Sequence, residues 1–393
     1  LEFRRVLFRS TFHAALAALP VCPAAHDNLT PDGWNWTLEE IRTQLAEVGG
    51  TVNVGCQYHT TDGRTHVLLT VHDYAPAVSM QLQGVRDNTS VTVDWGDGET
   101  ETATISNFTH VLNLSHTYSD VEGDTDYDVS IDAGEDGYTF REKGFDSPIR
   151  TEVKEIRLSD KVTSIPSRAF SSLTTLQSIT LPEGLEDIGQ YCFGSSGLEF
   201  VTVPASTVVL SPNCFYSCHN LQVVCLPAGI QSIGRWCFAY CEWLKSVTIP
   251  YGTATLGDYT FCWCYSLSSI AIPGTITDFQ ENLFQYCIKL ESVSISQGVQ
   301  SLQRNAFCAC TTLRAVTVPE SVNSIGIGCF TACSTLSAVY LRPAEPPALA
   351  NNDAFQYNHP SRRFYVPRGS LEAYRTAENW SAYASAMEEY DYE

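Results

Sequence analysis

The chain has 393 residues and a mass of 43.4 kDa, enough for about two to three domains. Hydrophobic residues make up 44% of the chain and charged residues 17%, which indicates a globular rather than a disordered protein. Asp and Glu outnumber Lys and Arg by 44 to 23, and the formal net charge of −21 argues against nucleic acid and anionic membranes as partners. The sequence contains no apolar run of the roughly 18 residues that a transmembrane helix needs.

The first ten residues, LEFRRVLFRS, resemble a common short-read sequencing adapter translated in frame. No initiator Met precedes them, so we treat residues 1–10 as adapter-derived and exclude them from the fold prediction. Residues 11–25 fit two alternatives, the tail of a signal peptide or the last turns of an amphipathic helix that ends at Pro20.

Residues 11–50 are predicted to form an N-terminal helical segment. The stretch TLEEIRTQLAEV, residues 37–48, has the pattern of a helix. Thr37 and Glu40 have the spacing of a capping box, and Gly49 suits the end of the helix.

Residues 51–145 are rich in short strand patterns, from TVNVGC at 51–56 to YDVSIDAG at 127–134. Asp62-Gly63 and Asp97-Gly98 are turn signals between these strands. The pattern predicts a small antiparallel β-sandwich over 51–145, followed by a linker over 146–155.

Two motifs in this region carry a resemblance. The turn Asp94-Trp95-Gly96-Asp97-Gly98 is followed by His116-Thr117-Tyr118 and by the strand YDVSI at 127–131. Over about 66–140 the chain therefore resembles a PKD-like domain, although Gly96 follows Trp95 directly where that family has further residues. The resemblance implies a structural spacer or a weak binder on an extracellular protein.

Two groups of side chains in the N-terminal half could hold a metal ion. The stretch 124–136 has carboxylates at several positions of a calcium loop, but Val129 stands where that loop needs Gly, and the same residues fit a strand. Cys56, His59, His66 and His72 have a loose zinc spacing. We predict no metal site and no cofactor, and calcium binding by 124–136 stays open.

The C-terminal half is a 23-residue repeat. Its units, here called coils 1–8, begin at the β-branched residue of a V/I-x-L/V/I-P motif, and the starts are Ile156, Ile179, Val201, Val224, Val247, Ile270, Val293 and Val316, with a ninth start at Val339. Position 15 is Phe in all eight coils: Phe170, Phe193, Phe215, Phe238, Phe261, Phe284, Phe307 and Phe330.

Such a repeat predicts a solenoid, because one unit cannot close a core alone and stacked units can bury a continuous stripe. The fold class is therefore mainly β, a solenoid of about eight coils over 156–342 preceded by the small antiparallel sandwich. We expect the eight Phe rings to stack into one buried column. The outward strand positions carry small residues: Thr180, Thr202, Thr248, Ala271, Ser294 and Thr317.

The string I-x-x-x-A/C-F-x-x-C-x-x-L-x-x-V-x-L/I-P closely resembles the BspA-like leucine-rich-repeat family. The tail 343–393 resembles the C-terminal cap of that family, with a strand at Phe364–Pro367, a helix capped at Ser370 and a short amphipathic piece. The resemblance implies adhesin-type binding to host or bacterial surface proteins. The order of a helical start, a sandwich and these repeats is also similar to some tail-associated proteins of gut phages.

Cysteines recur at position 18 of the coils, as Cys218, Cys241, Cys264, Cys287, Cys310 and Cys333. Their spacings invite a zinc interpretation, but they follow from the repeat, and a ladder of small buried thiols explains them better. Cys225, at an outward strand position, is the predicted exposed thiol.

Tyrosines and tryptophans gather on the turn side of coils 2–6. They are Tyr191, Tyr216, Trp236, Tyr240, Trp243, Tyr259, Trp263, Tyr265 and Tyr286. Exposed aromatic clusters are common anchors of protein and sugar recognition, and these nine residues are the candidate partner-binding site. The alternative is that the rings pack between coils and only cover the core.

No catalytic motif is present, so the chain is not predicted to be an enzyme and has no predicted catalytic residue. We expect a monomeric, non-catalytic, adhesin-like protein, extracellular or on the cell surface, that binds a protein or glycan on a host or bacterial surface. The alternative is a phage or prophage tail-associated structural or receptor-binding protein.

Overall fold

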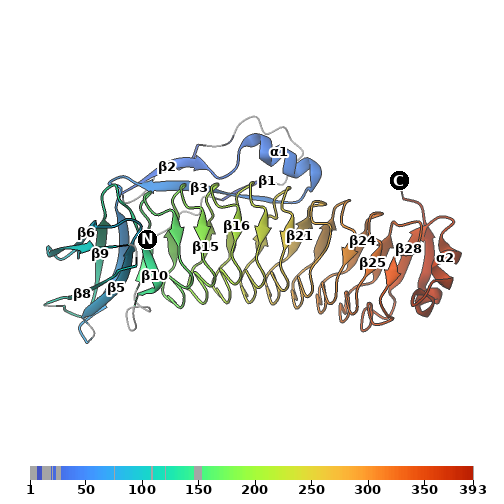
Figure 1. The fold of residues 1–393 in the computed structure, drawn as a ribbon. Helices are drawn as coiled ribbons and strands as arrows, with labels where there is room; N and C mark the ends of the chain where they lie inside the picture. Colours follow the sequence, from blue (N-terminus) through green and yellow to red (C-terminus); the bar gives the residue numbers. More distant parts are fainter. Residues whose placement is uncertain are drawn as a thin grey trace.

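A computed structural model describes residues 7–10, 19, 21–23, 28–74, 76–107, 109–119, 121–145 and 153–392. The protein is an elongated stack of coils with a sandwich at one end and a helical cap at the other (Figure 1). A segment from the N-terminal part of the chain lies along the side of the stack (Figure 1).

This N-terminal segment, here called the strap, comprises residues 28–60. It contains strand β2 (Leu29–Trp34), helix α1 (Leu38–Glu47) and strand β3 (Val52–Thr60). Strand β3 pairs antiparallel with β2 on one side and with β1 (Leu7–Ser10) on the other. The adapter origin of residues 1–10 stays a prediction, and most of residues 11–25 lie outside the described residues.

The predicted helix of the strap is confirmed. The Thr37 hydroxyl accepts from the Glu40 backbone N–H at 3.2 Å, and the Glu40 carboxylate accepts from the Thr37 N–H at 2.6 Å. Two orphan N–H groups are thus satisfied at the start of α1. Gly49 and Gly50 follow with φ of 74° and 80°, so the chain leaves the helix in the left-handed region that glycine tolerates.

The sandwich has two antiparallel layers. Its strands are β4 (Thr65–His72), β5 (Ala77–Gly84), β6 (Thr89–Asp94), β7 (Thr100–Ile105), β8 (Val111–Thr117), β9 (Asp124–Asp132) and β10 (Tyr138–Phe145). One layer has the order β10-β5-β8 and the other contains β4-β9-β6-β7. The predicted start at residue 51 differs from this arrangement, because β3 pairs within the strap. Strand periodicity shows which residues face a core but not which strand pairs with which.

The residues of the predicted PKD-like motif form one cluster in the sandwich. The Trp95 and His116 rings stack at 4.9 Å, and the His116 ring nitrogen lies 2.7 Å from the Asp97 carboxylate. The Tyr118 hydroxyl donates to the Trp95 carbonyl at 2.9 Å. Gly96 has φ of 82°, and a Cβ on it would lie 2.9 Å from the Asp128 carbonyl oxygen, so only glycine fits this turn.

The sandwich joins the solenoid through one continuous sheet. Strand β11 (Val153–Arg157) pairs antiparallel with β4 and parallel with β13 (Ser178–Thr180), the first strand of the next coil. The described part of the predicted linker 146–155 thus already belongs to a strand. The sandwich sheet covers the first edge of the stack, which would otherwise leave backbone groups unpaired.

Two rows of parallel strands run along the solenoid. The longer row continues with β15 (Phe200–Thr202), β17 (Val223–Cys225), β19 (Ser246–Val247), β21 (Ser269–Ile272), β22 (Ser292–Ile295), β24 (Ala315–Val318) and β26 (Ala338–Leu341). The short row is β12 (Ser164–Ile165), β14 (Asp187–Ile188), β16 (Val209–Leu210), β18 (Ser232–Ile233), β20 (Thr255–Leu256), β23 (Ser301–Leu302), β25 (Ser324–Ile325) and β27 (Ala348–Leu349). Each row is divided into successive short sheets, and within a sheet equivalent residues pair in register, as Val224 does with Val247.

The predicted Phe column is confirmed. All eight rings have no exposed surface, and successive rings stack with centroids 5.1 to 5.8 Å apart. Phe355 adds a ninth ring, 5.3 Å beyond Phe330. At the other end Phe140 of the sandwich contacts Phe170 at 5.0 Å. The column therefore extends past both ends of the eight predicted coils.

The last edge of the stack is covered by the C-terminal cap. It consists of β28 (Arg363–Pro367), α2 (Leu371–Thr376), the 3₁₀ helix η2 (Trp380–Ala386) and β29 (Met387–Tyr390). Strand β28 pairs with β26, and β29 pairs with β28. Ser370 is the N-cap residue of α2 as predicted, but its side chain makes no capping hydrogen bond.

The cysteines at position 18 are buried, as predicted for a structural ladder. Each thiol donates to the carbonyl of the position-15 Phe in the preceding coil, as Cys264 does to Phe238 at 3.2 Å. The same contact recurs for Cys218, Cys241, Cys287, Cys310 and Cys333 at 3.0 to 3.3 Å. Burial raises the pKa of the Cys218 thiol to about 11, so this thiol stays protonated at neutral pH.

Candidate functional site

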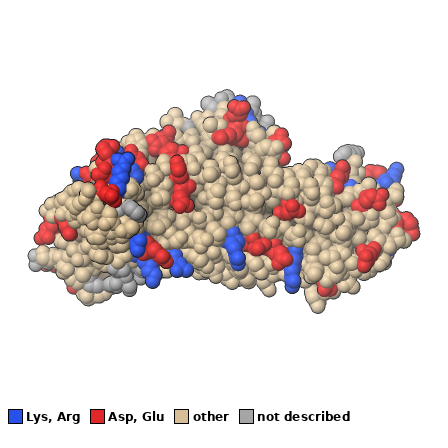
Figure 2. All heavy atoms as spheres, in the orientation of Figure 1, with Lys and Arg blue, Asp and Glu red and all other residues tan. Residues whose placement is uncertain are grey.

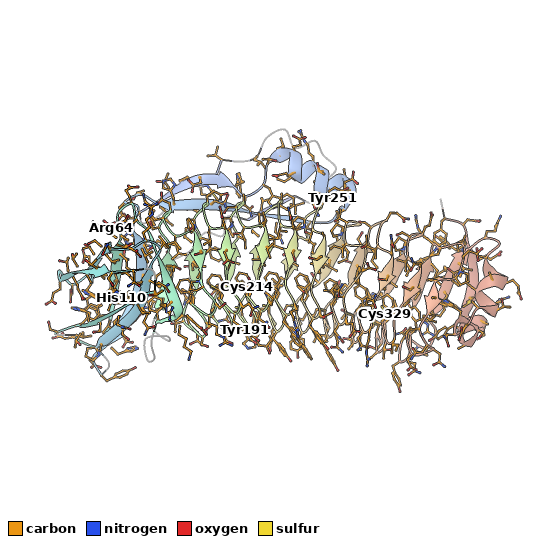
Figure 3. The ribbon with its side chains drawn as sticks, in the orientation of Figure 1. Arg64, His110, Tyr191, Cys214, Tyr251 and Cys329 are labelled. Carbon is orange, nitrogen blue, oxygen red and sulfur yellow. The ribbon has the colours of Figure 1, made fainter. Side chains whose placement is uncertain are left out.

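Seven of the nine predicted aromatic residues form one continuous set of ring contacts across coils 2–6, here called the aromatic ladder. Its members are Tyr191, Tyr216, Trp236, Tyr240, Tyr259, Trp263 and Tyr286. Tyr191 lies on the edge of the solenoid opposite Tyr251, which contacts the strap (Figure 3). The ladder and the strap therefore lie on opposite sides of the stack.

The rings of the ladder stack on one another along the axis of the solenoid. Trp263 lies between two tyrosine rings. Its ring centroid is 4.5 Å from that of Tyr240, with an angle of 7° between the ring planes, and 5.6 Å from that of Tyr286, with an angle of 10°. Trp236 stacks on Tyr259 at 4.1 Å. Because the stacked neighbours come from adjacent coils, they cover the flat faces of Trp263 and leave the ring edges toward solvent.

The backbone under the ladder is in the left-handed region. Positions 13 and 17 of the coils have positive φ, and at these positions Trp236 and Trp263 have φ of 58° and 59°. This conformation costs a bulky side chain about 1 to 2 kcal/mol. Where no ladder ring stands, the same positions carry smaller residues, with Asn282 and Asn305 at position 13 and Ala309 at position 17. The large rings are thus not what the turn itself favours.

The remaining two predicted residues are Trp243 and Tyr265. Trp243 is 57% exposed, more than any other of the nine, and Tyr265 is partly buried. The ladder rings pack between coils, as the core-covering alternative expected, and they also keep exposed edges, as a binding site needs. Whether they bind a partner is left as a proposal.

The charges near the ladder are mixed. The Arg168 guanidinium lies 5.4 Å from the centre of the Tyr191 ring, at the first end of the ladder. In the view of Figure 2, lysine and arginine side chains of the solenoid lie along the edge away from the strap, where they alternate with carboxylates. Partial burial, helped by Tyr216, raises the pKa of the Tyr240 phenol, which keeps it a neutral hydrogen-bond donor.

The opposite side, the outward face of the longer strands, is half covered by the strap. Strand β3 crosses coils 2–5, and in coil 5 the Asn53 N–H donates to the Thr248 hydroxyl at 2.7 Å and that hydroxyl donates to the Thr51 carbonyl at 2.9 Å. A Cβ on Gly55 would lie 2.2 Å from the Thr202 hydroxyl. The small outward residues are thus the floor on which the strap lies.

The strap also overturns one expectation. Cys225 is 1% exposed, although its outward strand position predicted an exposed thiol. Asn35 donates to the Cys225 carbonyl at 3.2 Å, and the neighbouring Trp36 indole donates to the Leu226 carbonyl at 2.6 Å. The sequence position was outward as predicted, but a distant segment of the chain covers it.

The acidic stretch 124–136 is mainly strand β9, and its carboxylates have cationic or polar partners across the sheet. Asp124 lies 2.5 Å from the His72 ring, and Asp126 lies 2.7 Å from the Lys154 ammonium. Asp128 contacts both His66 and Arg157. Asp124, Asp126 and Asp128 share one face of an extended strand, where neighbouring carboxylates are roughly 7 Å apart, so they do not converge as a calcium loop does.

The loose zinc group is also dispersed. Cys56 and His59 lie on β3, where His59 contacts Asp32 at 2.6 Å, while His66 and His72 lie at the two ends of β4. Among the residues that the structure describes, no group of three or more His, Cys, Asp and Glu side chains is placed to hold a metal ion.

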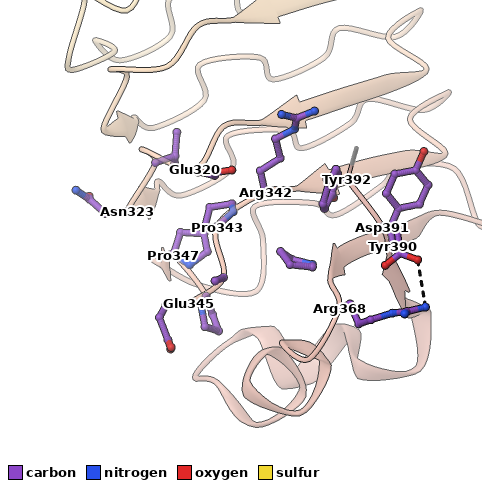
Figure 4. Close-up of a pocket in the computed structure, with 14 residues that line it drawn as sticks. Glu320, Asn323, Arg342, Pro343, Glu345, Pro347, Arg368, Tyr390, Asp391 and Tyr392 are labelled. Atoms are coloured by element: carbon purple, nitrogen blue, oxygen red, sulfur yellow. Dashed lines mark ion pairs between the residues drawn. The ribbon is translucent and has the colours of Figure 1, made fainter.

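A second aromatic group lies at the C-terminal end of the strand face and was missed from the sequence. Tyr340 and Tyr365 stack at 4.8 Å, and Tyr390 packs edge-on against both at 5.4 and 5.7 Å. Next to it is an open cavity of about 680 Å³ lined by Arg342, the loop after it, and Tyr392 (Figure 4). The signal was the change from small outward residues to Tyr at the equivalent positions 340 and 365.

The family model of the BspA type leucine rich repeat region matches six copies of the repeat, within residues 142–265 and 231–362. Together these two ranges cover more than half of the chain. The chain belongs to the BspA-type leucine-rich-repeat family. The solenoid predicted for 156–342 is thereby confirmed in family as well as in fold. A comparison with curated proteins gave no match.

Three solved structures are similar to this chain. A leucine-rich repeat protein of Eubacterium ventriosum ATCC 27560 is 20% identical, with 52% of this chain and 76% of that chain covered and a TM-score of 0.35. A leucine-rich repeat protein of Bacteroides ovatus ATCC 8483 is 20% identical, with 64% of this chain and 87% of that chain covered and a TM-score of 0.27. A leucine rich cell surface protein of Faecalibacterium prausnitzii A2-165 is 16% identical, over 56% and 81%, with a TM-score of 0.26.

Within the described residues, no helix combines the length and the apolar character that crossing a bilayer requires.

Proposed function

We propose that this chain is a non-catalytic, adhesin-like binding protein of the cell surface or extracellular space, and that its aromatic ladder contacts a partner protein. The family supports a surface binding role, and the ladder is the feature that distinguishes coils 2–6 from the other coils. The single observation that carries the proposal is the stack of partly exposed rings at backbone positions where other coils have Asn, Gly or Ala.

The orientation of the rings favours a protein over a glycan. A sugar packs its C–H groups on the flat face of an aromatic ring, but the faces of Trp263 are covered by Tyr240 and Tyr286. What remains is a row of ring edges, which carry partial positive charge, together with indole and phenol hydrogen-bond donors. Such a row suits the carbonyl and carboxylate oxygens of a protein surface.

The ladder is also well placed energetically for a protein interface. Tyr and Trp are the residues that most often dominate binding energy, and they lose little conformational freedom when already stacked. The rings are spaced along a rigid stack of β-strands, so a partner meets them in a fixed geometry. Rigid presentation of this kind reduces the entropy lost on association.

The test uses variants matched to neighbouring coils. Trp236→Asn copies Asn282, and Trp263→Ala copies Ala309, so the double variant keeps side chains that this backbone already accepts. Wild type and variant are applied to immobilised host surface proteins and to a glycan array. We expect protein binding by the wild type and about a hundredfold loss in the variant.

Tyr357→Ala is the control, because Tyr357 is 77% exposed with φ of 56° but lies in the ninth coil outside the ladder. Glycan binding that depends on Trp263, or protein binding unaffected by the double variant, would contradict the proposal. The neighbouring genes and the native N-terminus distinguish this proposal from the alternative of a phage or prophage tail-associated protein.

A further inference from the structure

The strand face has an open half that continues the floor under the strap. The turn at Gly50 is the point where the strap reaches farthest along the solenoid. It lies against Ala271 of coil 6, and a Cβ added to Gly50 would be 3.2 Å from the Ala271 Cβ. Beyond it the outward residues are again small, and Ser292, Ser294, Ala315 and Thr317 are exposed. A cavity of about 300 Å³ lies between the end of the strap and the serines of β22. The same floor is thus covered in coils 2–5 and uncovered in coils 7 and 8.

The prolines of the repeat explain how the strap is held. At position 4 of a coil, a residue with an N–H donates to the position-3 carbonyl of the preceding coil, as Ser296 does to Ile272 at 3.0 Å. Proline has no N–H, so the carbonyl that faces it lacks this partner. Position 4 is proline in five successive coils, as Pro182, Pro204, Pro227, Pro250 and Pro273, and the last three stand opposite carbonyls that the strap contacts.

The strap supplies the missing donors one after another. Asn35 donates to the Val203 carbonyl at 3.4 Å, Trp36 donates to Leu226 at 2.6 Å and Gln44 donates to Ile249 at 3.0 Å. These are the three carbonyls that face Pro227, Pro250 and Pro273. The strap is therefore recognised by a repeated acceptor pattern that the V/I-x-L/V/I-P motif creates.

The same rule holds at the far end of the solenoid. Pro367 is level with Arg342 in the paired strands, so it faces the Leu341 carbonyl, and the Tyr392 hydroxyl donates to that carbonyl at 3.1 Å. Arg342 has an N–H and donates to Val318 at 3.0 Å. Beyond the strap, the repeat period sets the Ile295 carbonyl opposite another proline, Pro319, and Ile295 is partly exposed.

We propose that an extended segment of a partner protein docks on the open strand face between Gly50 and Tyr340 and continues the path of the strap. Small side chains of the segment lie against Ser294 and Thr317, and an amide or indole N–H donates to the Ile295 carbonyl. Three coil spacings of about 4.8 Å separate Ala271 from Tyr340, which is room for about four extended residues. The stacked Tyr340 and Tyr365 rings form the far end of the site.

This surface lies across the solenoid from the aromatic ladder and is independent of it. We expect the occupant to be an extended peptide, because the chain itself places a strand, with Gly55 and amide side chains, on the same floor. The open half of the floor is continuous with that interface. Hydrogen bonds from amide or indole donors supply affinity, as they do for the strap, and the small floor selects small residues.

The experiment selects a phage-displayed library of random linear peptides on the full chain and measures the enriched peptides by fluorescence anisotropy. We expect peptides with Gly, Ser or Ala at alternate positions and an Asn, Gln or Trp among them. Thr317→Trp fills the exposed floor without entering the core and should weaken binding at least a hundredfold. Pro319→Ala restores the N–H that pairs with Ile295 inside the solenoid, and should weaken binding about threefold to tenfold, the value of one hydrogen bond.

The controls separate this site from the aromatic ladder and from self-association. Trp236→Asn with Trp263→Ala should leave peptide binding unchanged, so a failure here and a failure of the proposed function are distinguishable. No enriched family of this pattern, or peptides indifferent to Thr317→Trp, would overturn the proposal. A concentration-dependent dimer that Thr317→Trp abolishes would overturn it in favour of a second copy of the chain as occupant.

Discussion

The solenoid contains two parallel stacks of aromatic rings in the same coils, and they differ in almost every other respect. The inner column is Phe in every coil, fully buried, with spacings of 5.1 to 5.8 Å. The aromatic ladder mixes Tyr and Trp, is confined to coils 2–6 and keeps exposed edges. Both sets of rings are therefore stacked. The inner column has the same residue in every coil because the fold needs it, whereas the residues of the aromatic ladder vary between coils because the fold does not need them.

The backbone supports the same distinction. A Phe at position 15 points into a space that only a ring of that size fills, since the coils on either side present the same ring. Six of the seven ladder rings stand at positions 13 and 17, which accept Asn, Ala, Ser or Gly in other coils with the same positive φ. The fold thus constrains the inner residue by packing and the outer residue only by backbone conformation.

The largest test of this comparison is Phe261→Ala in coil 5. It removes a ring between Phe238 and Phe284, at 5.5 and 5.4 Å, from a fully buried site. We expect a loss of about 3–5 kcal/mol in the free energy of unfolding, because the neighbouring coils cannot collapse into the cavity. Urea unfolding followed by circular dichroism measures it, and a loss below that of the ladder variant would refute the inner role.

The matched change is Trp263→Ala, two residues along the same coil. It removes two close stacked contacts, to Tyr240 and Tyr286, each about 0.5–1.5 kcal/mol, and a wider one to Trp236 at 6.2 Å, from a partly exposed position. We expect a loss of about 1–2 kcal/mol with unchanged circular dichroism, because Ala309 and Ala332 already occupy this position in later coils. A cost equal to that of Phe261→Ala would show that the ladder is part of the core.

Cys264→Ala, in the same coil, sharpens the comparison further. The change removes a buried thiol and its hydrogen bond to the Phe238 carbonyl, but that carbonyl keeps the Cys241 N–H as a donor at 3.2 Å. We expect a loss of about 1 kcal/mol. Cys264→Ser should recover part of it, because the hydroxyl can donate to the same carbonyl, and equal losses in both variants would mean that volume alone matters.

The repeat made the solenoid predictable because its period fixes which residues meet. Phe at position 15 and Cys at position 18 recur at a constant spacing, so stacking follows from the sequence alone. The helix at 37–48 was equally accessible, since Thr37 and Glu40 are local neighbours. Both successes depend on contacts between residues whose separation is known in advance.

The strap was not predictable by the same means. Asn35, Trp36 and Gln44 contact residues about 170 to 205 positions away, and nothing periodic connects them. Strand β3 was therefore assigned to the sandwich, and Cys225 was expected to be exposed. The proline at position 4 was visible in the repeat, but its effect on the preceding coil became apparent only once the coils were paired.

The smallest expected effect concerns the junction where the inner column enters the sandwich. His66 on β4 lies between Asp62, at 3.0 Å, and Asp128, at 3.2 Å, and Asp128 also contacts Arg157 of β11. Burial lowers the pKa of His66, but Asp128 and Asp62 outweigh it, so the pKa is raised above 6.5. The Arg157 and His66 contacts lower the pKa of Asp128 against the opposing effect of burial.

The sign of the pH dependence follows from the raised pKa of His66. Its contribution to stability is complete below the unfolded pKa of 6.5 and is lost as the pH rises through the folded pKa. We expect the midpoint of thermal unfolding to fall over that window, and His66→Asn to flatten this part of the profile while leaving the Phe261→Ala and Trp263→Ala differences unchanged. A profile that His66→Asn does not alter would mean that the ion pairs at the junction are too solvated to stabilise it, and that the β4–β11 pairing and the Phe140–Phe170 contact hold the sandwich on the solenoid without them.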